Sequence, residues 1–274
     1  NDGEADDSIY LVRRFKDHFV PAITLALAMD YLNVTKEEVE VVVGSHILLP
    51  SPESYNPETG QWEPYRIMET PATFDEEGNV ATEAVYRDVP EIRVPIDDEA
   101  RMLINYMGVR SSAARDGHQT FPVRPFAGYA ARVPGPDPST WPPTKALANK
   151  IVMVGAFASG IVDDEKPTPY GLMYGIEMFA NSLNTIIMDN FLHEVPMWVN
   201  LLVLAGLVLL VSFLTARVGT LWSVGVTVLA VIALFFTATI LFDVEALMLD
   251  FAAPAIAVGL AFIAVVVYRV MTEE

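Results

Sequence analysis

Three consecutive carboxylates near residue 165 have the most obvious capacity for chemistry. Asp163, Asp164 and Glu165 could bind a cation, because hard cations prefer oxygen ligands. The complete pattern of a calcium-binding loop is absent, so a solvated surface loop is the preferred interpretation. The run Asp97–Glu99 flanks a turn and is interpreted in the same way. Neither run predicts a metal site.

Two glycines, Gly155 and Gly160, stand where a phosphate-binding loop would follow a strand. Their spacing matches neither the dinucleotide-binding pattern nor the P-loop, and no Lys-Ser or Lys-Thr pair follows them. We therefore interpret them as glycines of a tight strand exit. The histidines lack metal-ligand spacing, and no serine has the context of a catalytic nucleophile. The sequence predicts no catalytic residue, no metal site and no cofactor.

The segments around these residues predict an α/β domain. Lys150–Gly155 is an apolar, β-branched run that predicts a buried strand, and Gly175–Asn190 predicts a helix. Apolar residues recur at helical spacing and predict the buried face of that helix: Ile176, Phe179, Leu183, Ile186 and Ile187. A strand, a loop and a helix in this order favour a sheet that is at least partly parallel.

The chain before this unit predicts short elements separated by turns. It predicts one helix, Pro21–Leu32, and the strands Ile9–Arg14, Val39–Val43 and Arg101–Tyr106. Prolines, acidic residues and aromatic residues alternate between positions 50 and 90 and predict an irregular insertion. Within it, Tyr65–Met68 and Ala81–Arg87 predict a hairpin.

Three apolar stretches predict transmembrane helices: Pro196–Ala216, Gly219–Leu241 and Leu249–Tyr268. Each has about 20 residues, enough to cross roughly 30 Å of hydrocarbon as a helix. Their interiors carry no charge, which argues against an ion path and for anchoring. The less favoured interpretation is a buried helical core of a soluble protein. Three spans place the preceding domain and the C-terminus on opposite sides of a membrane.

The charges beside the stretches predict their direction. Arg217 follows the first stretch and Arg269 follows the third, whereas Glu194 and Asp243 flank the opposite ends. Basic residues favour the cytoplasmic ends of spans. We therefore expect the N-terminal domain outside and the C-terminus in the cytoplasm.

Composition excludes two classes of function. The net charge of the chain is −18. The part before Pro196 contains 30 of the 35 acidic residues and 15 of the 17 basic residues, so it has twice as many acidic as basic residues. Such an acidic domain repels nucleic acid, so nucleic-acid binding is excluded. There is no cysteine, which excludes disulfides and thiolate metal sites and fits a bacterial extracytoplasmic domain.

The first residue is Asn1 and no signal peptide is recognised, so we expect an upstream segment.

Three segments together resemble one known family. Val94–Gly108 resembles the "IPLD-x-x-G-R-x-x-I-N-Y-x-G" stretch of the CHASE extracellular sensor domain, type 2. Lys150–Ala156 is similar to its "KIVLVGATA" strand. Asp163, Thr168–Pro169 and Gly175–Asn181 resemble its "D…TP…PGVEIHAN" continuation. The similarity covers about Ile9 to Leu192, and in that family three membrane helices commonly follow, as here.

The chain also departs from that family. The family usually begins with a membrane helix and a first segment that includes a "WPWPR"-like turn, and neither is recognised after Asn1. Tyr174 replaces a proline that often precedes the glycine, and the insertion at 50–90 is longer than usual. We therefore expect residues 1–192 to be a sensor domain that lacks its N-terminal part, and residues 193–274 to be the membrane segment.

The resemblance implies a receptor in the bacterial inner (plasma) membrane with a periplasmic or extracellular sensor. Its output domain is expected beyond this chain and is often a class III adenylate or guanylate cyclase, and sometimes a kinase. The expected partners are the lipid bilayer, a second copy in a homodimer, and an unknown ligand or protein. The loop after the predicted strand is our candidate ligand-sensing site, with Ser159, Asp163, Asp164 and Thr168. A structural or assembly subunit without a small ligand is the alternative.

Overall fold

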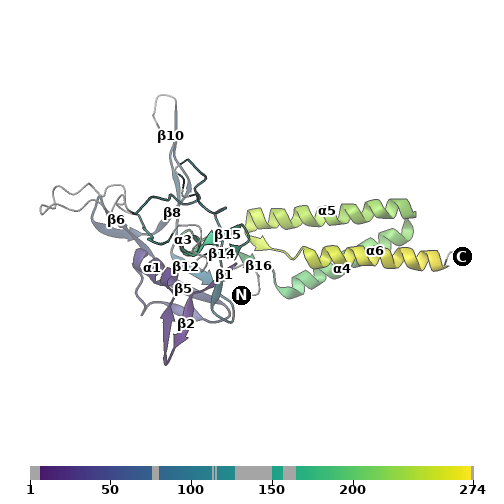
Figure 1. Cartoon of the computed structure of the whole chain (residues 1–274), viewed down its shortest axis with the longest axis horizontal. Coiled ribbons are helices and arrows are strands. Elements are labelled where there is room, and N and C mark those ends of the chain that lie inside the picture. The colour runs from purple at the N-terminus through teal and green to yellow at the C-terminus, as the bar shows by residue number, and fades with distance from the viewer. Residues whose placement is uncertain are drawn as a thin grey trace. The chain divides into compact units, whose positions relative to one another are not determined.

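The computed structural model describes residues 7–75, 80–112, 114, 116–126, 150–156 and 165–272. The chain forms two compact units, Asn1–Phe191 and Leu192–Glu274, and each is considered by itself (Figure 1). The described part of the first unit contains short strands and two helices, and the second contains three long helices. The predicted class, an α/β domain followed by three helices that could cross a membrane, is confirmed.

A three-stranded antiparallel sheet provides much of the core of the first unit. Its strands are β4 (Glu40–Val42), β5 (His46–Pro50) and β12 (Glu91–Pro95), in the order β12-β5-β4. Side chains alternate between the two faces of a strand, so every second residue of β5 and β12 is buried. The helices α1 (Ile23–Tyr31) and α3 (Gly175–Ile187) pack together and complete this core. The residues that the sheet and helices contribute include Ile47, Leu49, Ile92, Val94, Leu25, Ala28, Leu183 and Ile186.

The remaining strands of this unit form antiparallel pairs. They are β1 (Ser8–Tyr10) with β13 (Arg101–Leu103), β2 (Val12–Phe15) with β3 (His18–Pro21), β6 (Glu53–Asn56) with β7 (Gln61–Pro64), β8 (Arg66–Thr70) with β11 (Val85–Asp88), β9 (Thr73–Phe74) with β10 (Val80–Thr82), and β14 (Glu165–Thr168) with β15 (Gly171–Tyr174). The β8–β11 pair confirms the hairpin predicted inside the 50–90 insertion.

One tyrosine joins this insertion to the core. Tyr65 is buried, and its hydroxyl donates a hydrogen bond to the carbonyl oxygen of Ile187 at 3.1 Å. Burial raises the pKa of Tyr65 above its ordinary value. The insertion is therefore a packed part of the domain at its base, as the aromatic residues in its sequence indicate.

The prediction of a buried strand at Lys150–Gly155 is wrong. Residues 150–156 form no strand, and Val152 and Val154 are 52% and 64% exposed. A partly parallel sheet is also not found, since all strand pairs described in the first unit are antiparallel. β-Branched residues favour extended backbone, but a strand also needs a paired neighbour, and this run has none among the described residues.

Gly155 has a packing role in place of the predicted strand exit. A Cβ atom at Gly155 would overlap the side chain of Ile176 on α3. We predict that Gly155→Val lowers the free energy of unfolding by about 1–3 kcal/mol, because added volume strains a packed contact. Chemical unfolding of the purified chain in detergent measures this change. Val154→Ala removes an exposed side chain nearby and should change stability by less than about 0.5 kcal/mol. Equal unfolding midpoints for the two variants would contradict the contact with α3.

The second unit consists of α4 (Met197–Arg217), α5 (Thr220–Glu245) and α6 (Ala252–Thr272). Each helix contacts the other two, and Val211, Leu234 and Val258 are buried between them. Before α4, β16 (His193–Glu194) pairs in parallel with β17 (Leu247–Met248), which links α5 to α6. At the other end, a guanidinium nitrogen of Arg269 donates to the carbonyl oxygen of Val218 at 2.7 Å.

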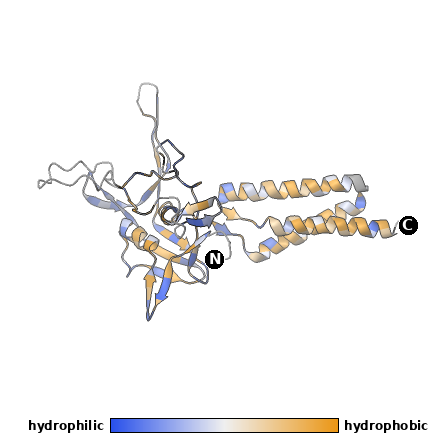
Figure 2. Ribbon diagram, in the orientation of Figure 1, coloured by the Kyte–Doolittle hydropathy of each residue, from blue (hydrophilic) through white to orange (hydrophobic). Residues whose placement is uncertain are grey.

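All three helices are long and apolar enough to cross a membrane. The candidate spans are Met197–Arg217, Trp222–Glu245 and Ala252–Thr272. Figure 2 shows that hydrophobic residues predominate along all three helices. Only 6–11% of their residues are buried within the unit, so most apolar side chains need another apolar environment. A bilayer provides that environment.

Candidate functional site

Four polar side chains of α3 are buried, and three of them, all but Ser182, form a row. Glu177, Asn181 and Thr185 are spaced four residues apart, which places them in a row along the helix. None is more than 4% exposed. Buried polar groups need hydrogen-bond partners, and these three find them in the backbone of Asn105–Ser111. We call Glu177, Asn181 and Thr185 the α3 docking row.

The docking row accepts hydrogen bonds from backbone N–H groups of a segment that has no regular structure. Thr185 Oγ1 accepts a hydrogen bond from the N–H of Asn105 at 3.1 Å, and Asn181 Oδ1 accepts one from Met107 at 2.9 Å. Glu177 Oε1 accepts a third from the N–H of Ser111 at 2.9 Å. These donors would otherwise need a neighbouring strand. The helix therefore holds Asn105–Ser111 in a fixed place without a sheet.

A second layer of the chain packs on this segment. The Ser111 hydroxyl accepts from the N–H of Phe121 at 3.0 Å, and Thr120 Oγ1 donates to the carbonyl oxygen of Val109 at 2.7 Å. A Cβ atom at Gly108 would lie 3.1 Å from Thr120 Oγ1, so glycine permits this close approach. Asn105–Ser111 is thus held from two sides.

An ion pair joins the same segment to the β14–β15 hairpin. Arg110 and Glu165 are 3.1 Å apart, and the Arg110 guanidinium carbon lies 4.9 Å from the ring centroid of Tyr174. The rings of Tyr106 and Tyr170 make a further contact, with 6.4 Å between centroids. The hairpin, α3 and Asn105–Ser111 therefore form one connected group of elements.

The predicted sensing residues lie beside this group or outside the described residues. Ser159, Asp163 and Asp164 fall among residues that the structure does not describe. Thr168 ends β14 and is 6% exposed; its hydroxyl donates to the carbonyl oxygen of Gly171 at 2.7 Å and accepts from the N–H of Tyr170. Thr168 therefore closes the turn of the hairpin. The sensing role of the loop remains a prediction.

The described residues position segments rather than provide a reaction centre. No group of three or more His, Asp or Glu side chains among them is placed to hold a metal ion. Glu177 Oε2 is buried and has no hydrogen-bond partner in the part of the chain described. Its other oxygen is committed to Ser111, so the carboxyl group acts as an anchor for the backbone.

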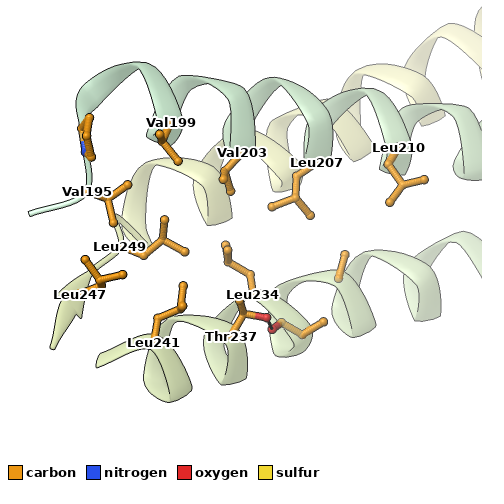
Figure 3. Close-up of a pocket in the computed structure, with 13 residues that line it drawn as sticks. Val195, Val199, Val203, Leu207, Leu210, Leu234, Thr237, Leu241, Leu247 and Leu249 are labelled. Carbon is orange, nitrogen blue, oxygen red and sulfur yellow. Dashed lines mark hydrogen bonds between the residues drawn. The ribbon is translucent and has the colours of Figure 1, made fainter. Parts of the chain in front are cut away.

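A separate apolar groove lies between α4 and α5 in the second unit. It has a volume of about 530 Å³ and is lined by valine, leucine and alanine side chains from both helices and their ends (Figure 3). The hydroxyl of Thr237 is the polar group in its wall, and it already donates to the carbonyl oxygen of Ala233 at 2.8 Å. The groove therefore offers nothing that would orient a polar ligand.

The segments that meet at the α3 docking row are Val94–Gly108 and Gly175–Asn181, two of those that resemble the type 2 sensor. The family model of the CHASE2 domain matches residues 2–216. The chain belongs to the CHASE2 domain family. No curated protein and no solved structure matches it. A CHASE2 sensor domain together with three candidate spans makes the chain a membrane sensory module with an extracellular sensor domain.

The turn before β13 explains part of the CHASE2 pattern. Asp97 Oδ1 accepts hydrogen bonds from the N–H groups of Glu99 and Arg101, and Asp97 Oδ2 lies 2.9 Å from Arg101 Nε. Ala100 has a φ of 60°, a left-handed conformation that glycine adopts more easily, and the family stretch has glycine at this position. The Asp–Gly–Arg pattern therefore encodes a turn, and alanine is accommodated here with backbone strain.

We predict that Asp97→Ala lowers the free energy of unfolding by about 1 kcal/mol at neutral pH, since loss of a comparable capping side chain costs that much. Partial burial raises the pKa of Asp97, but hydrogen bonds from Arg101 and Glu99 outweigh it, so the net pKa is lowered. A lowered pKa stabilises the fold above the unfolded pKa of about 3.9, and this contribution is lost as pH falls through the folded value.

Unfolding of the full chain in detergent at neutral and acidic pH tests this expectation. The difference between Asp97→Ala and the parent should shrink below about pH 4. Asp98→Ala is the matched control, because Asp98 is exposed and its carboxylate makes no hydrogen bond with the described residues. A difference that grows on acidification would contradict the role of the Asp97 carboxylate.

Sequence reasoning found the helix of the docking row but predicted only part of its buried face. Leu183 and Ile186 are buried as predicted, whereas Phe179 is 40% exposed. The signal for the docking row was present as polar residues at four-residue spacing, Glu177, Asn181 and Thr185. Apolar periodicity alone does not reveal a helix face that buries hydrogen bonds.

Proposed function

We propose that this chain is the sensor and membrane segment of a bacterial receptor in the inner (plasma) membrane. The observation that carries the proposal is the CHASE2 match, which runs from residue 2 through most of α4, the first of three candidate spans. Three spans put the two ends of the chain on opposite sides of the membrane. A module that relays a signal across the membrane needs this arrangement.

The charges support one orientation. Arg217 and Arg269 occupy the last turns of α4 and α6, and the opposite ends carry acidic residues. Since basic residues favour cytoplasmic ends, the sensor domain is periplasmic or extracellular and the C-terminus is cytoplasmic.

The relay begins with a ligand or protein partner that binds at the loop Ser159–Thr168. That loop ends in β14, where Glu165 pairs with Arg110 of the segment held by α3. Binding therefore shifts the packing of α3 and of the chain that continues into α4. The chain acts as a homodimer, and its transmembrane helices transmit this change in packing to a cytoplasmic output domain outside this chain. A class III adenylate or guanylate cyclase is the output that the family most suggests.

Reporter fusions test the orientation. Alkaline phosphatase, which is active only outside the cytoplasm, should be active when inserted between the expected upstream segment and the sensor domain, and inactive when fused after α6. A fluorescent protein that matures only in the cytoplasm should give the reverse. The opposite pattern would refute the receptor proposal.

The sensing loop needs a separate test in the full-length protein. We expect Asp163→Ala with Asp164→Ala to change cyclic nucleotide production in membranes. Asp88→Ala, on β11 of the insertion, is the control and should leave production unchanged. Unchanged production in the double variant would remove the loop from the mechanism, and an output with no cyclase or kinase activity would favour an assembly subunit.

A further inference from the structure

The hairpin β2–β3 exposes aromatic side chains that a water-soluble surface normally buries. Phe15 and Phe19 are 64% and 73% exposed, and Val20 is 46% exposed. β3 contacts α1, where Ile23 at the start of the helix is 60% exposed. Several large apolar side chains exposed on one short hairpin make that hairpin a candidate interaction site.

The pairing register distributes these residues over both faces of the hairpin. Residues directly opposite each other in an antiparallel pair lie on the same face. Phe15 is opposite His18, and the neighbouring pair is Arg14 opposite Phe19. Side chains alternate between the faces of a strand, so one phenylalanine lies on each face. All residues of both strands except Val12 are exposed. The hairpin therefore presents an aromatic and basic side chain on each side, which suits contact with a partner on either face.

The hairpin is basic, whereas its domain is acidic. Three of the 15 basic residues before Pro196 lie in it, Arg13, Arg14 and Lys16, but only Asp17 of the 30 acidic residues does. None of these three cations forms an ion pair with a described residue. Arg13 instead lies 4.2 Å from the centroid of the Tyr10 ring, and Arg14 Nε donates to the carbonyl oxygen of Lys16. Their charges are available to carboxylates of a partner.

A second copy of this chain offers such carboxylates. The rest of its domain is strongly acidic, and exposed carboxylates without an ion-pair partner among the described residues include Asp30, Glu40 and Asp98. Two copies anchored in one membrane with the same orientation also have a high effective concentration. We propose that the β2–β3 hairpin is a dimer contact that docks on the acidic surface of a second copy. The proposal rests on the homodimer in the proposed function and adds the surface that forms it.

A lipid surface fits the hairpin less well. Its turn is Lys16-Asp17, so the residues that would enter a bilayer first are charged, and charges in hydrocarbon are costly. The acidic remainder of the domain would also be repelled by anionic headgroups. The aromatic residues lie behind the charged turn, where a protein surface can cover them and pair the charges at the same time.

Site-specific photo-crosslinking in membranes tests the proposal with the full chain. The photoreactive amino acid p-benzoylphenylalanine replaces Phe19 in one version and Tyr86 in another. Tyr86 is also half-exposed on a hairpin, β8–β11, and serves as the matched control. Illumination should give a covalent adduct of twice the chain mass from position 19 and little from position 86.

Charge reversal tests the electrostatic part. Combining Arg13→Glu, Arg14→Glu and Lys16→Glu should reduce the position-19 adduct at least tenfold, whereas Arg66→Glu on the control hairpin should not. The adduct should also decrease near 1 M salt, where the screening length falls to about 3 Å. An adduct that is insensitive to both changes would contradict docking on an acidic surface.

The mass of the protein in lipid nanodiscs distinguishes failure of the hairpin contact from failure of the homodimer. A dimeric mass without a position-19 dimer adduct would overturn the hairpin contact and leave the homodimer intact. A monomeric mass would overturn both. Adducts of position 19 with lipid, or with another protein alone, would also overturn the proposal.

Discussion

Asn181→Leu is expected to release the segment Asn105–Ser111 from α3 and to destabilise the sensor domain by about 2–4 kcal/mol. Asn181 is fully buried and accepts from the N–H of Met107 at 2.9 Å, while its amide donates to the carbonyl oxygen of Glu177 at 2.8 Å. Leucine has similar length but no polar atoms, so the Met107 donor loses its partner. An unpaired buried donor costs about 1–3 kcal/mol, and the branched side chain adds a packing penalty of similar size.

Hydrogen–deuterium exchange of the full chain in detergent measures this effect. Peptides that contain Met107 and Ser111 should exchange faster in Asn181→Leu, and those of β5 should change only with global stability. Asn184→Leu is the matched control on the same helix, because Asn184 is only partly buried and its amide makes no hydrogen bond with the described residues. Faster exchange in both variants alike would show that the helix itself is perturbed rather than the docking row.

This docking arrangement shows why sequence patterns recovered some elements and missed their assembly. The pattern of Gly175–Asn190 predicted a helix, and apolar periodicity located Leu183 and Ile186 on its buried side. The buried polar residues could not be recognised in that way, because their partners are backbone groups more than 60 residues earlier in the chain. Propensity likewise assigned Lys150–Gly155 to a strand, although pairing depends on neighbours that are distant in sequence.

The long apolar helices could be predicted because they do not depend on partners that are distant in sequence. Their structure depends on local hydrogen bonds within one segment, and their length is set by the thickness of the bilayer. The three helices accordingly lie where hydropathy placed them, with α5 and α6 extended beyond the predicted C-terminal ends. The candidate sensing residues were chosen because their loop follows the predicted strand Lys150–Gly155, and residues 150–156 form no strand. Their support now rests on β14 and the Arg110–Glu165 pair.

Val211→Asp is expected to prevent stable insertion of α4. Val211 is fully buried within the three-helix unit and lies well inside the candidate span Met197–Arg217. Insertion of an aspartate at the middle of a span costs about 2.5–3.5 kcal/mol, and no Lys or Arg lies in the interior of the three candidate spans to pair with it. The buried carboxylate would also separate α4 from its neighbours. Because α5 and α6 remain apolar spans, the measurement is the orientation of the chain ends: the fraction of protein whose C-terminus is cytoplasmic, reported by a fluorescent protein fused after α6, should fall by about tenfold or more.

The matched control places the same charge at the end of the same helix. Asn200→Asp conserves side-chain size and lies in the first turn of α4, where the interface is polar and a negative charge is favourable near a helix N-terminus. It should insert as the parent does. If Val211→Asp also inserts normally, α4 is not a transmembrane helix, and the opposite placement of the two chain ends, on which the receptor proposal depends, fails with it. If both variants lose insertion, the defect reflects added charge anywhere on α4 rather than depth in the membrane.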